Sequence, residues 1–296
     1  MQPASIVLLF HAVGTPEATG YKDAIPVEAF DRALHWLQAN YRVVPLDDLA
    51  ARQALGEDLT GLAALSFDDN HRSVAEVGLP LVAARGLPAT WYLMTAALAG
   101  EAYWRRKVTR VLASGQEAAF RAFLQARAPA LAEAIRPGRL YKDSKDPTRV
   151  SPSAMAELFA AFDPSGGPEP DFVTPGEVAA LDLPGITLGN HSHRHLVMSG
   201  LSAEAQQREI AVASEALSHF PQPKSRLFCV PFGGAKTYNS ATLEATALAG
   251  LAGLAVTADG LVDADDFARH PLLAAESFKG QALARCLSLA LGAVLS

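Results

Sequence analysis

Two short clusters in the sequence contain side chains able to hold or activate a divalent cation. Asp68 and Asp69 follow the apolar run LAALSF, and His191 and His195 stand four residues apart after GITLGN. Within a helical turn, residues at this spacing share one face, so the two imidazoles can bind one ion. Two histidines and one carboxylate make three N/O ligands and leave a position open for water, which is the pattern of a catalytic zinc-type site.

Each cluster also has a simpler interpretation, and the residues alone leave both open. Adjacent aspartates at the end of a strand often cap the next helix, and histidines at this spacing also occur on surfaces that bind no ion. In the functional interpretation, one carboxylate binds the metal while the other, kept ionised by the cation, takes a proton from water. His193, between the other two histidines, is expected to face solvent or to support a ligand.

The elements that must position these groups form an alternating pattern. Short apolar runs alternate with helix-like stretches, which predicts an α/β fold with a parallel sheet or barrel. Strands are expected at 5–10, 42–45, 62–67, 89–94, 185–189, 226–230 and 252–257, and a closing helix at 281–295. Because functional groups gather at the carboxyl ends of parallel strands, His11, both clusters and the PFGG segment after RLFCV are expected at one end of the fold.

Composition limits the organisation and the partners. The chain has 296 residues, of which 50% are hydrophobic, so we expect one large domain over 1–296. The formal net charge of −6 argues against nucleic acid as a partner. Residues 101–150 nevertheless carry eleven Lys/Arg against five Asp/Glu, which predicts a basic helical insertion at about 101–160. That block either faces an anionic partner or simply exposes its arginines.

The sequence also predicts a location. No apolar run approaches the ~20 residues that a membrane-spanning helix needs. The start, MQPASIVLLFHAVG, reads as a strand and not as a signal peptide. Two cysteines favour a reducing compartment, so a cytoplasmic protein is expected. Nothing in the sequence indicates an oligomeric state.

Three segments carry a resemblance to the polysaccharide deacetylase (NodB-homology) family, the fourth carbohydrate esterase family. LSFDDN resembles its T-F-D-D-G motif, GNHSHRH its H-[ST]-x-x-H motif, and FCVPFGGAKTYN its third motif. The opening LLFHAVG and the stretch from PVEAF to PLDDLA resemble the subgroup that includes poly-N-acetylglucosamine deacetylases. The resemblance extends from residue 6 to about 257, excluding the basic insertion.

The resemblance implies a distorted (β/α)7-type barrel and a metal-dependent hydrolase that removes N-linked acetyl or a similar acyl group from an amino sugar or polysaccharide. It implies that Asp68 is the catalytic base and that Asp69, His191 and His195 bind a divalent metal. Zinc is expected first, with cobalt, nickel or manganese as alternatives. The backbone N–H of Phe232 would help to hold the oxyanion.

The sequence departs from the family pattern at three places. Cys229 stands where many members have an arginine that orients the base, and it is expected to be a small buried residue. Asn70 follows the aspartate pair in place of glycine. The late Leu-x-His that supplies the general acid is missing, which leaves His270 or His11 for that role. His11 is the better candidate, against the simpler interpretation of a histidine bonded to backbone.

Candidate substrate contacts lie at or beside these motifs: Phe232, Asn70, Trp91, Trp104 and Tyr238. Trp104, at the start of the basic insertion, would stack on a sugar ring.

Two other functions stay open. One is an amide or ester hydrolase acting on a nucleotide-linked or lipid-linked sugar or another small substrate, favoured by the apparent lack of a leader. The other is a non-catalytic carbohydrate-binding barrel, which a full set of ligands and base argues against.

Overall fold

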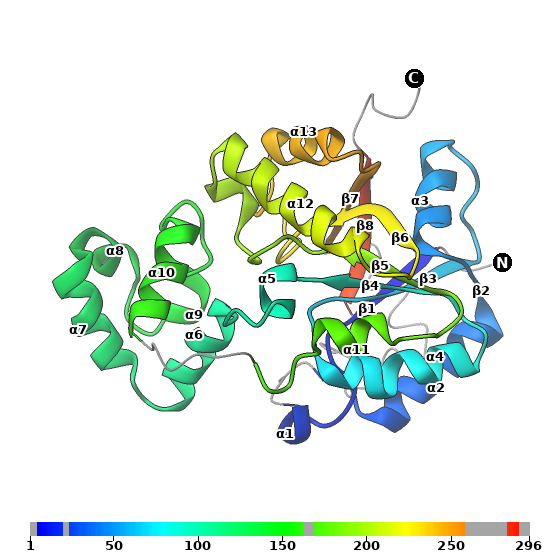
Figure 1. The fold of residues 1–296 in the computed structure, drawn as a ribbon, viewed down its shortest axis with the longest axis horizontal. Coiled ribbons are helices and arrows are strands. Elements are labelled where there is room, and N and C mark those ends of the chain that lie inside the picture. Colours follow the sequence, from blue (N-terminus) through cyan, green and yellow to red (C-terminus); the bar gives the residue numbers. More distant parts are fainter. Residues whose placement is uncertain (1–4, 20–23, 163–168, 258–282, 290–296) are drawn as a thin grey trace.

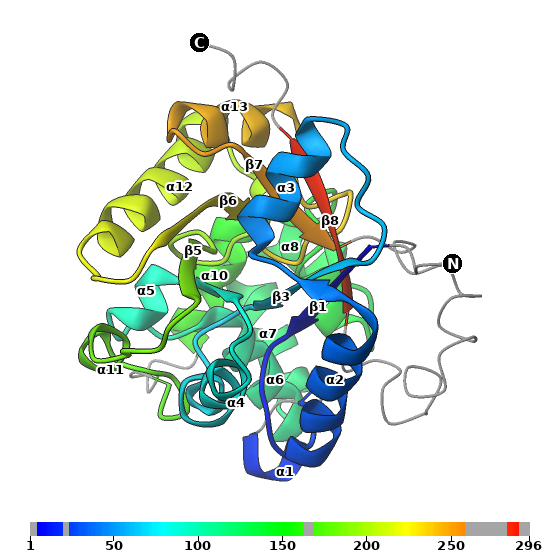
Figure 2. The same cartoon turned by 90° about the vertical axis from the view of Figure 1, so that its right-hand side faces the viewer.

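The strands of this protein form a closed ring. The computed structural model describes residues 5–19, 24–162, 169–257 and 283–289. Its strands are β1 (Ile6–Phe10), β2 (Arg42–Val43), β3 (Leu62–Phe67), β4 (Ala89–Leu93), β5 (Ile186–Asn190), β6 (Lys224–Cys229), β7 (Gly253–Thr257) and β8 (Leu283–Leu289). They lie in the order β1-β8-β7-β6-β5-β4-β3-β2, and β1 also pairs with β3 (Figure 2). Seven strands therefore close on themselves, and β2 extends the sheet beyond β3. The predicted α/β barrel is confirmed.

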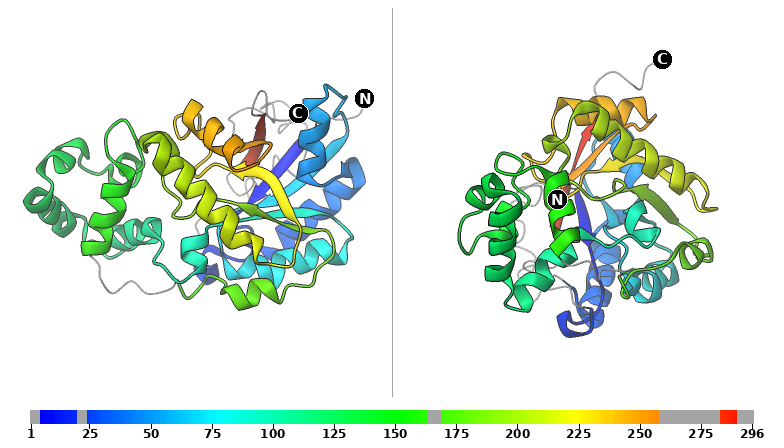
Figure 3. Two further views of the ribbon diagram at one scale, coloured as in Figure 1. Left: turned by 45° about the horizontal axis from the view of Figure 1, so that its top comes forward. Right: turned by 60° about the vertical axis from the view of Figure 1, so that its left-hand side comes forward.

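Helices surround the ring and follow most of its strands (Figures 1 and 3). Those that accompany the barrel are α1 (Pro16–Thr19), α2 (Val27–Asn40), α3 (Leu46–Ala54), α4 (Leu79–Ala84), α5 (Thr95–Leu98), α11 (Pro175–Ala179), α12 (Ala203–Ser218) and α13 (Ser240–Leu248). A π-helical turn, η1 (Val74–Gly78), precedes α4, and a 3₁₀ turn, η2 (Met198–Gly200), precedes α12. As expected, Ser202 caps α12 by accepting a hydrogen bond from the N–H of Ala205.

Alternation along the strands divides the core into two parts. In β1 and β3, one set of side chains, including Phe10 and Phe67, packs against Phe30 of α2, with ring centroids 5.0 and 5.9 Å from that ring. The alternate set, with Tyr92 and Cys229 from other strands, forms a second cluster. Both faces of β1 and β3 are buried, which is why their sequences are continuous apolar runs.

The prediction of a closing helix at 281–295 is wrong for residues 283–289, which are the part of that range that the structure describes. Leu283–Leu289 form β8, which pairs antiparallel with β7 over five positions and with β1 over two. Without β8, β1 and β7 would each expose a row of unpaired backbone groups. Closure of the ring therefore outweighs the helical preference that the local sequence suggests.

The basic insertion forms a helical lobe at one side of the barrel (Figure 1). Its helices are α6 (Trp104–Ala113), α7 (Glu117–Arg127), α8 (Pro129–Ala134), α9 (Leu140–Asp143) and α10 (Pro152–Phe162). They share a core in which Phe120 stacks on Phe159 at 4.2 Å between ring centroids. Met94 and Leu196 of the barrel belong to the same core, so the lobe packs onto the end of the barrel at which β4 and β5 finish.

Within the described residues, no helix combines the length and the apolar character that a membrane span requires.

Candidate functional site

The strand register brings the predicted groups to one end of the barrel. Phe10 pairs with Phe67, and the N–H of Asp68 donates to the carbonyl of Phe10 at 2.9 Å, so His11 and Asp68 leave neighbouring strands side by side. Leu93 pairs with Asn190 in the same way, and its carbonyl accepts from the N–H of His191 at 3.1 Å. The aspartate pair follows β3 and the histidine loop follows β5. Because β4 pairs with both strands, the two clusters, more than a hundred residues apart, meet at one end of the barrel.

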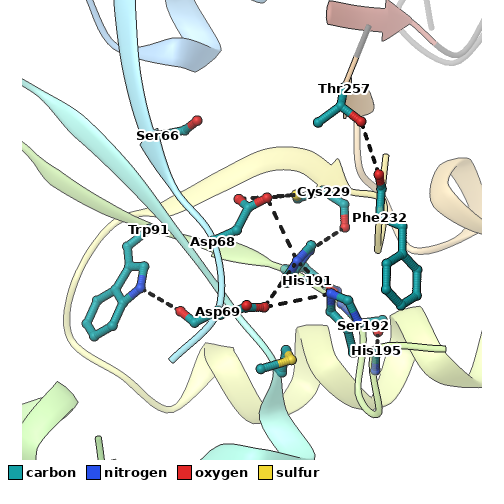
Figure 4. A network of polar contacts seen from close by, with 12 residues as sticks. Ser66, Asp68, Asp69, Trp91, His191, Ser192, His195, Cys229, Phe232 and Thr257 are labelled. Carbon is teal, nitrogen blue, oxygen red and sulfur yellow. Dashed lines mark hydrogen bonds and ion pairs between the residues drawn. The ribbon is translucent and has the colours of Figure 1, made fainter. Parts of the chain in front are cut away.

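Three side-chain atoms converge there (Figure 4). The Nε2 atoms of His191 and His195 lie 3.2 Å apart, and Oδ1 of Asp69 lies 3.8 and 3.7 Å from them. All three residues are buried. A tetrahedral zinc ion with bonds of about 2.0–2.1 Å holds its ligand atoms about 3.3 Å apart. The triangle matches that spacing closely enough for one small cation, so the residues fit a divalent metal.

A hydrogen bond to each Nδ1 orients both imidazoles, and for His191 it also fixes the tautomer. Nδ1 of His191 donates to the carbonyl of Cys229 at 2.9 Å, which leaves the lone pair on Nε2. Nδ1 of His195 lies 3.2 Å from the hydroxyl of Tyr103. Burial lowers the pKa of His195 well below its usual value, and the charges of His191, Arg105 and His11 lower it further. A neutral imidazole is the form that binds metal.

Strained backbone places these side chains. Among the described residues, the non-glycine residues with positive φ are Asp69 (65°), Ser192 (64°), His195 (55°) and Phe232 (65°), and every one belongs to the three motifs. Such conformations cost on the order of 1–3 kcal/mol each and gather at functional sites. The expected helical turn between His191 and His195 is wrong: residues 191–195 form no helix, and two left-handed residues bring the rings together.

A network of short hydrogen bonds supports the histidine loop. The side chain of Asn190 accepts from the N–H of Ser192 at 2.8 Å, and the hydroxyl of Ser192 accepts from the N–H of His195 at 2.9 Å. His193 is half-buried, and its Nδ1 lies 2.9 Å from the hydroxyl of Thr95. His193 therefore supports the loop and points away from the ligand atoms, consistent with the supporting role considered for it.

Asp68 faces the same cluster from another side. Its Oδ2 lies 3.9 Å from Nε2 of His191, and the thiol of Cys229 lies 3.4 Å from both of its oxygens. Cys229 is 1% exposed, as expected of a small buried residue, and its thiol donates toward the Asp68 carboxylate. Only the Asp69 carboxylate is close to both Nε2 atoms, which supports Asp69 as the ligand and Asp68 as the free carboxylate.

The PFGG segment lies across the site from the aspartates. Phe232 has φ of 65°, and its backbone N–H donates to no protein acceptor within the described residues. Gly233 follows with φ of 63°, where a Cβ would come within 2.5 Å of the backbone nitrogen of Thr257. Thr257 in turn donates its hydroxyl to the carbonyl of Phe232 at 3.0 Å. The loop therefore leaves the N–H of Phe232 without a protein acceptor in the described part of the chain, and holds its ring 4.7 Å from that of His195.

Comparison with known proteins agrees with this geometry. Residues 152–254 match the family model of polysaccharide deacetylases. The predicted resemblance to the polysaccharide deacetylase family is confirmed. The matched segment contains both histidine ligands and Phe232, whereas the aspartate pair lies before it. No curated protein sequence matches the chain.

Solved structures show the same fold at low sequence identity. A Streptococcus pyogenes deacetylase, PplD, in complex with acetate is 14% identical, with a TM-score of 0.52 over 85% of this chain and 82% of that one. A de-N-acetylase from Aggregatibacter actinomycetemcomitans is also 14% identical, with a TM-score of 0.51 over 84% of this chain and 86% of that one. The barrel fold is thus common to all three.

Three predicted substrate contacts are buried and already hydrogen-bonded. The amide of Asn70 donates to the carbonyl of Met94 and accepts from its N–H, both at 2.9 Å. The indole of Trp91 donates to the carbonyl of Asp69 at 2.8 Å, and that of Trp104 donates to the carbonyl of His195 at 3.1 Å. The structure thus gives each of them a supporting role, since these bonds hold strand ends and ligand backbones in place.

The remaining predicted residues differ in how close they come to the cluster. His11 is half-buried beside Asp68, and its imidazole makes no hydrogen bond within the described residues, so the interpretation as a backbone-bonded histidine finds no support. Tyr238 is half-buried and packs against a separate cluster around α13. His270 lies outside the described residues. His11 is therefore the described candidate for the general acid.

Two residues of the site were missed at the sequence level. Tyr103 supports His195, and Arg105 stacks with its guanidinium carbon 5.5 Å from the centroid of the Phe232 ring. Both flank Trp104, which the sequence did single out. The available signal was the run of aromatic and basic residues at the start of the insertion, immediately after the strand end at β4.

Proposed function

We propose that this protein is a metal-dependent deacetylase that removes an N-linked acetyl or similar acyl group from an amino sugar. The observation that carries the proposal is the convergence of Asp69 Oδ1 and the two histidine Nε2 atoms, with the Asp68 carboxylate beside them. The family match and the deacetylase neighbours support the same reaction class.

The residues divide the work of hydrolysis among them. Asp69, His191 and His195 would hold the ion, which when bound polarises the acyl carbonyl and lowers the pKa of a water to about 7. Asp68 takes a proton from the attacking water. The N–H of Phe232 donates to the oxyanion as the carbonyl carbon becomes tetrahedral.

His11 completes the reaction in this proposal. The leaving amine of the sugar must gain a proton as the C–N bond breaks, and the half-buried imidazole of His11 lies beside Asp68 at the same end of the barrel. Histidine suits this task because its ordinary pKa is near neutrality. Zinc is the first candidate for the metal because two imidazoles and one carboxylate suit it, and cobalt, nickel and manganese accept similar ligands.

The test combines metal analysis with a substrate panel. Protein purified without a chelating tag should contain about one equivalent of a divalent metal, and it should release acetate from small or polymeric N-acetyl amino sugars. Activity should be lost with a chelator and return with zinc or cobalt. Protein that binds stoichiometric metal yet releases no acyl group from any member of the panel would refute the proposal and favour a carbohydrate-binding barrel.

Two variants distinguish the roles of the aspartates. Asp68→Asn should retain the metal and lose about 10²–10⁴-fold in turnover, because it lacks only the base. Asp69→Asn should lose the stoichiometric metal, as should His191→Ala. If Asp68→Asn loses the metal while Asp69→Asn retains it, the two roles are reversed.

A further inference from the structure

Arg105, a buried cation of the lobe, has no carboxylate partner in the part of the chain that the structure describes. Arg105 is 5% exposed, and its guanidinium donates to the hydroxyl of Ser144 at 3.0 Å and to the carbonyl of Tyr141 at 3.2 Å. It forms no ion pair within the described residues. Six other arginines of the lobe do pair with carboxylates: Arg106, Arg110, Arg121, Arg136, Arg139 and Arg149. The charge of Arg105 is thus left uncompensated where charge is most costly.

This uncompensated charge faces the proposed active site. The guanidinium carbon of Arg105 lies 4.4 Å from the ring centroid of Tyr141 and 5.5 Å from that of Phe232. The ammonium of Lys145 lies 5.4 and 5.3 Å from the same two centroids. Both cations therefore lie near the same two aromatic rings, although Arg105 comes from α6 and Lys145 from the segment after α9.

Phe232 separates the cations from the ligand cluster by a single ring. Its centroid lies 4.7 Å from that of His195, so both positive groups are within about 10 Å of the His195 ring. A substrate with its acyl group at the metal ligands would place the next part of the molecule near this pair.

We propose that Arg105 and Lys145 form an anion subsite that binds a carboxylate or phosphate group of the substrate, close to the acylated amine. A guanidinium carries five N–H donors, and its planar fork matches the paired oxygens of such a group. The inference rests on the proposed function, because it assumes that the acyl sugar lies at Phe232. It narrows the substrate to acidic amino sugars or sugar phosphates.

The charge balance of the lobe explains why Arg105, and not the whole basic block, would select the substrate. Most of its arginines are neutralised by Glu169, Asp171 or acidic residues within the lobe. Exposed charges that are already paired attract a ligand weakly in salt. A buried guanidinium and a half-buried ammonium are screened less, so they retain their attraction at physiological ionic strength.

Binding of unreactive sugars tests the subsite independently of turnover. Glucose, glucose 1-phosphate and glucuronate carry no acyl group, so calorimetric titration of the whole protein measures recognition alone. We expect one or both of the anionic sugars to bind at least tenfold more tightly than glucose. Preference for the phosphate or for the carboxylate identifies the anion. Equal binding of all three sugars would overturn the proposal.

Paired variants locate the binding. Lys145→Met should weaken binding of the preferred anion about tenfold, whereas Lys142→Met, an exposed lysine of the same segment, removes the same charge and should leave binding unchanged. Arg105→Lys keeps the charge without the fork and should also weaken it. Equal behaviour of Lys145→Met and Lys142→Met would show that only diffuse charge matters, and would overturn the subsite. Because these titrations need no catalysis, they stand even if no acyl release is found.

Discussion

The support that Tyr103 gives to His195 leads to a quantitative prediction for metal affinity. In Tyr103→Phe the ring remains but the hydroxyl 3.2 Å from Nδ1 of His195 is lost. That nitrogen carries the proton when Nε2 binds metal, and His195 is only 4% exposed, so the N–H would be left buried without its acceptor. Such a loss costs about 1–3 kcal/mol, which predicts that the dissociation constant for zinc rises about 10–100-fold.

The assay is a competition between metal-free protein and a chromophoric chelator of known affinity. Tyr92→Phe is the matched control, because Tyr92 is also buried and its hydroxyl lies 3.3 Å from that of Ser225, remote from the ligands. The control should leave zinc affinity within twofold of the wild type. A Tyr103→Phe protein whose zinc affinity equals that of the control would show that the hydroxyl does not orient His195, and the reasoning would fail.

Two further predictions concern stability. Gly189→Ala should lower the melting temperature by an amount equivalent to about 1–3 kcal/mol or more, because the new Cβ would lie 2.2 Å from the buried ring of Tyr92. Gly176→Ala, where a Cβ meets open space, should leave the melting temperature unchanged. Equal melting temperatures of the two variants would contradict this packing. For the metal-free protein, the lowered pKa of His195 means that the unfolded chain binds its proton first as the pH falls below about 6.5. Urea unfolding should therefore show the free energy of unfolding falling by up to about 1.4 kcal/mol per pH unit below pH 6.5. The fall should be less steep in His195→Gln. An unchanged slope in that variant would exclude His195 as the cause.

Much of the barrel was predictable because buried parallel strands read as continuous apolar runs. LAALSF and IVLLF could be assigned for that reason, and the polar residues after them marked the functional end. The strand at Leu283–Leu289 could not be assigned in this way, since its partners β1 and β7 are distant in sequence and their need for closure has no local signature. Short elements that complete a ring depend on tertiary context.

In the candidate site, too, local sequence predicts some features, whereas others depend on tertiary contacts. The residue types and spacing of Asp69, His191 and His195 predict a metal site, and the structure brings their ligand atoms together. The four-residue spacing of His191 and His195 suggested a helical turn. Instead, the left-handed backbone of Ser192 and His195 brings the two rings together, and sequence periodicity does not reveal such a conformation. Trp91 and Trp104 are buried, and their indole N–H groups donate to the backbone of Asp69 and of His195, respectively. Burial of this kind depends on the neighbours that the fold supplies.

The separation of Asp69 from His191 and His195 along the chain would make the proposed metal site a late product of folding. Asp69 ends β3, whereas His191 and His195 follow β5, and the helical lobe lies between them in sequence. A segment limited to 152–254 would contain both imidazoles but not the carboxylate. The cation therefore has no complete binding site until β3, β4 and β5 are paired in register, and pairing of such distant strands is slow. Metal uptake during refolding would report the moment when this side of the ring assembles.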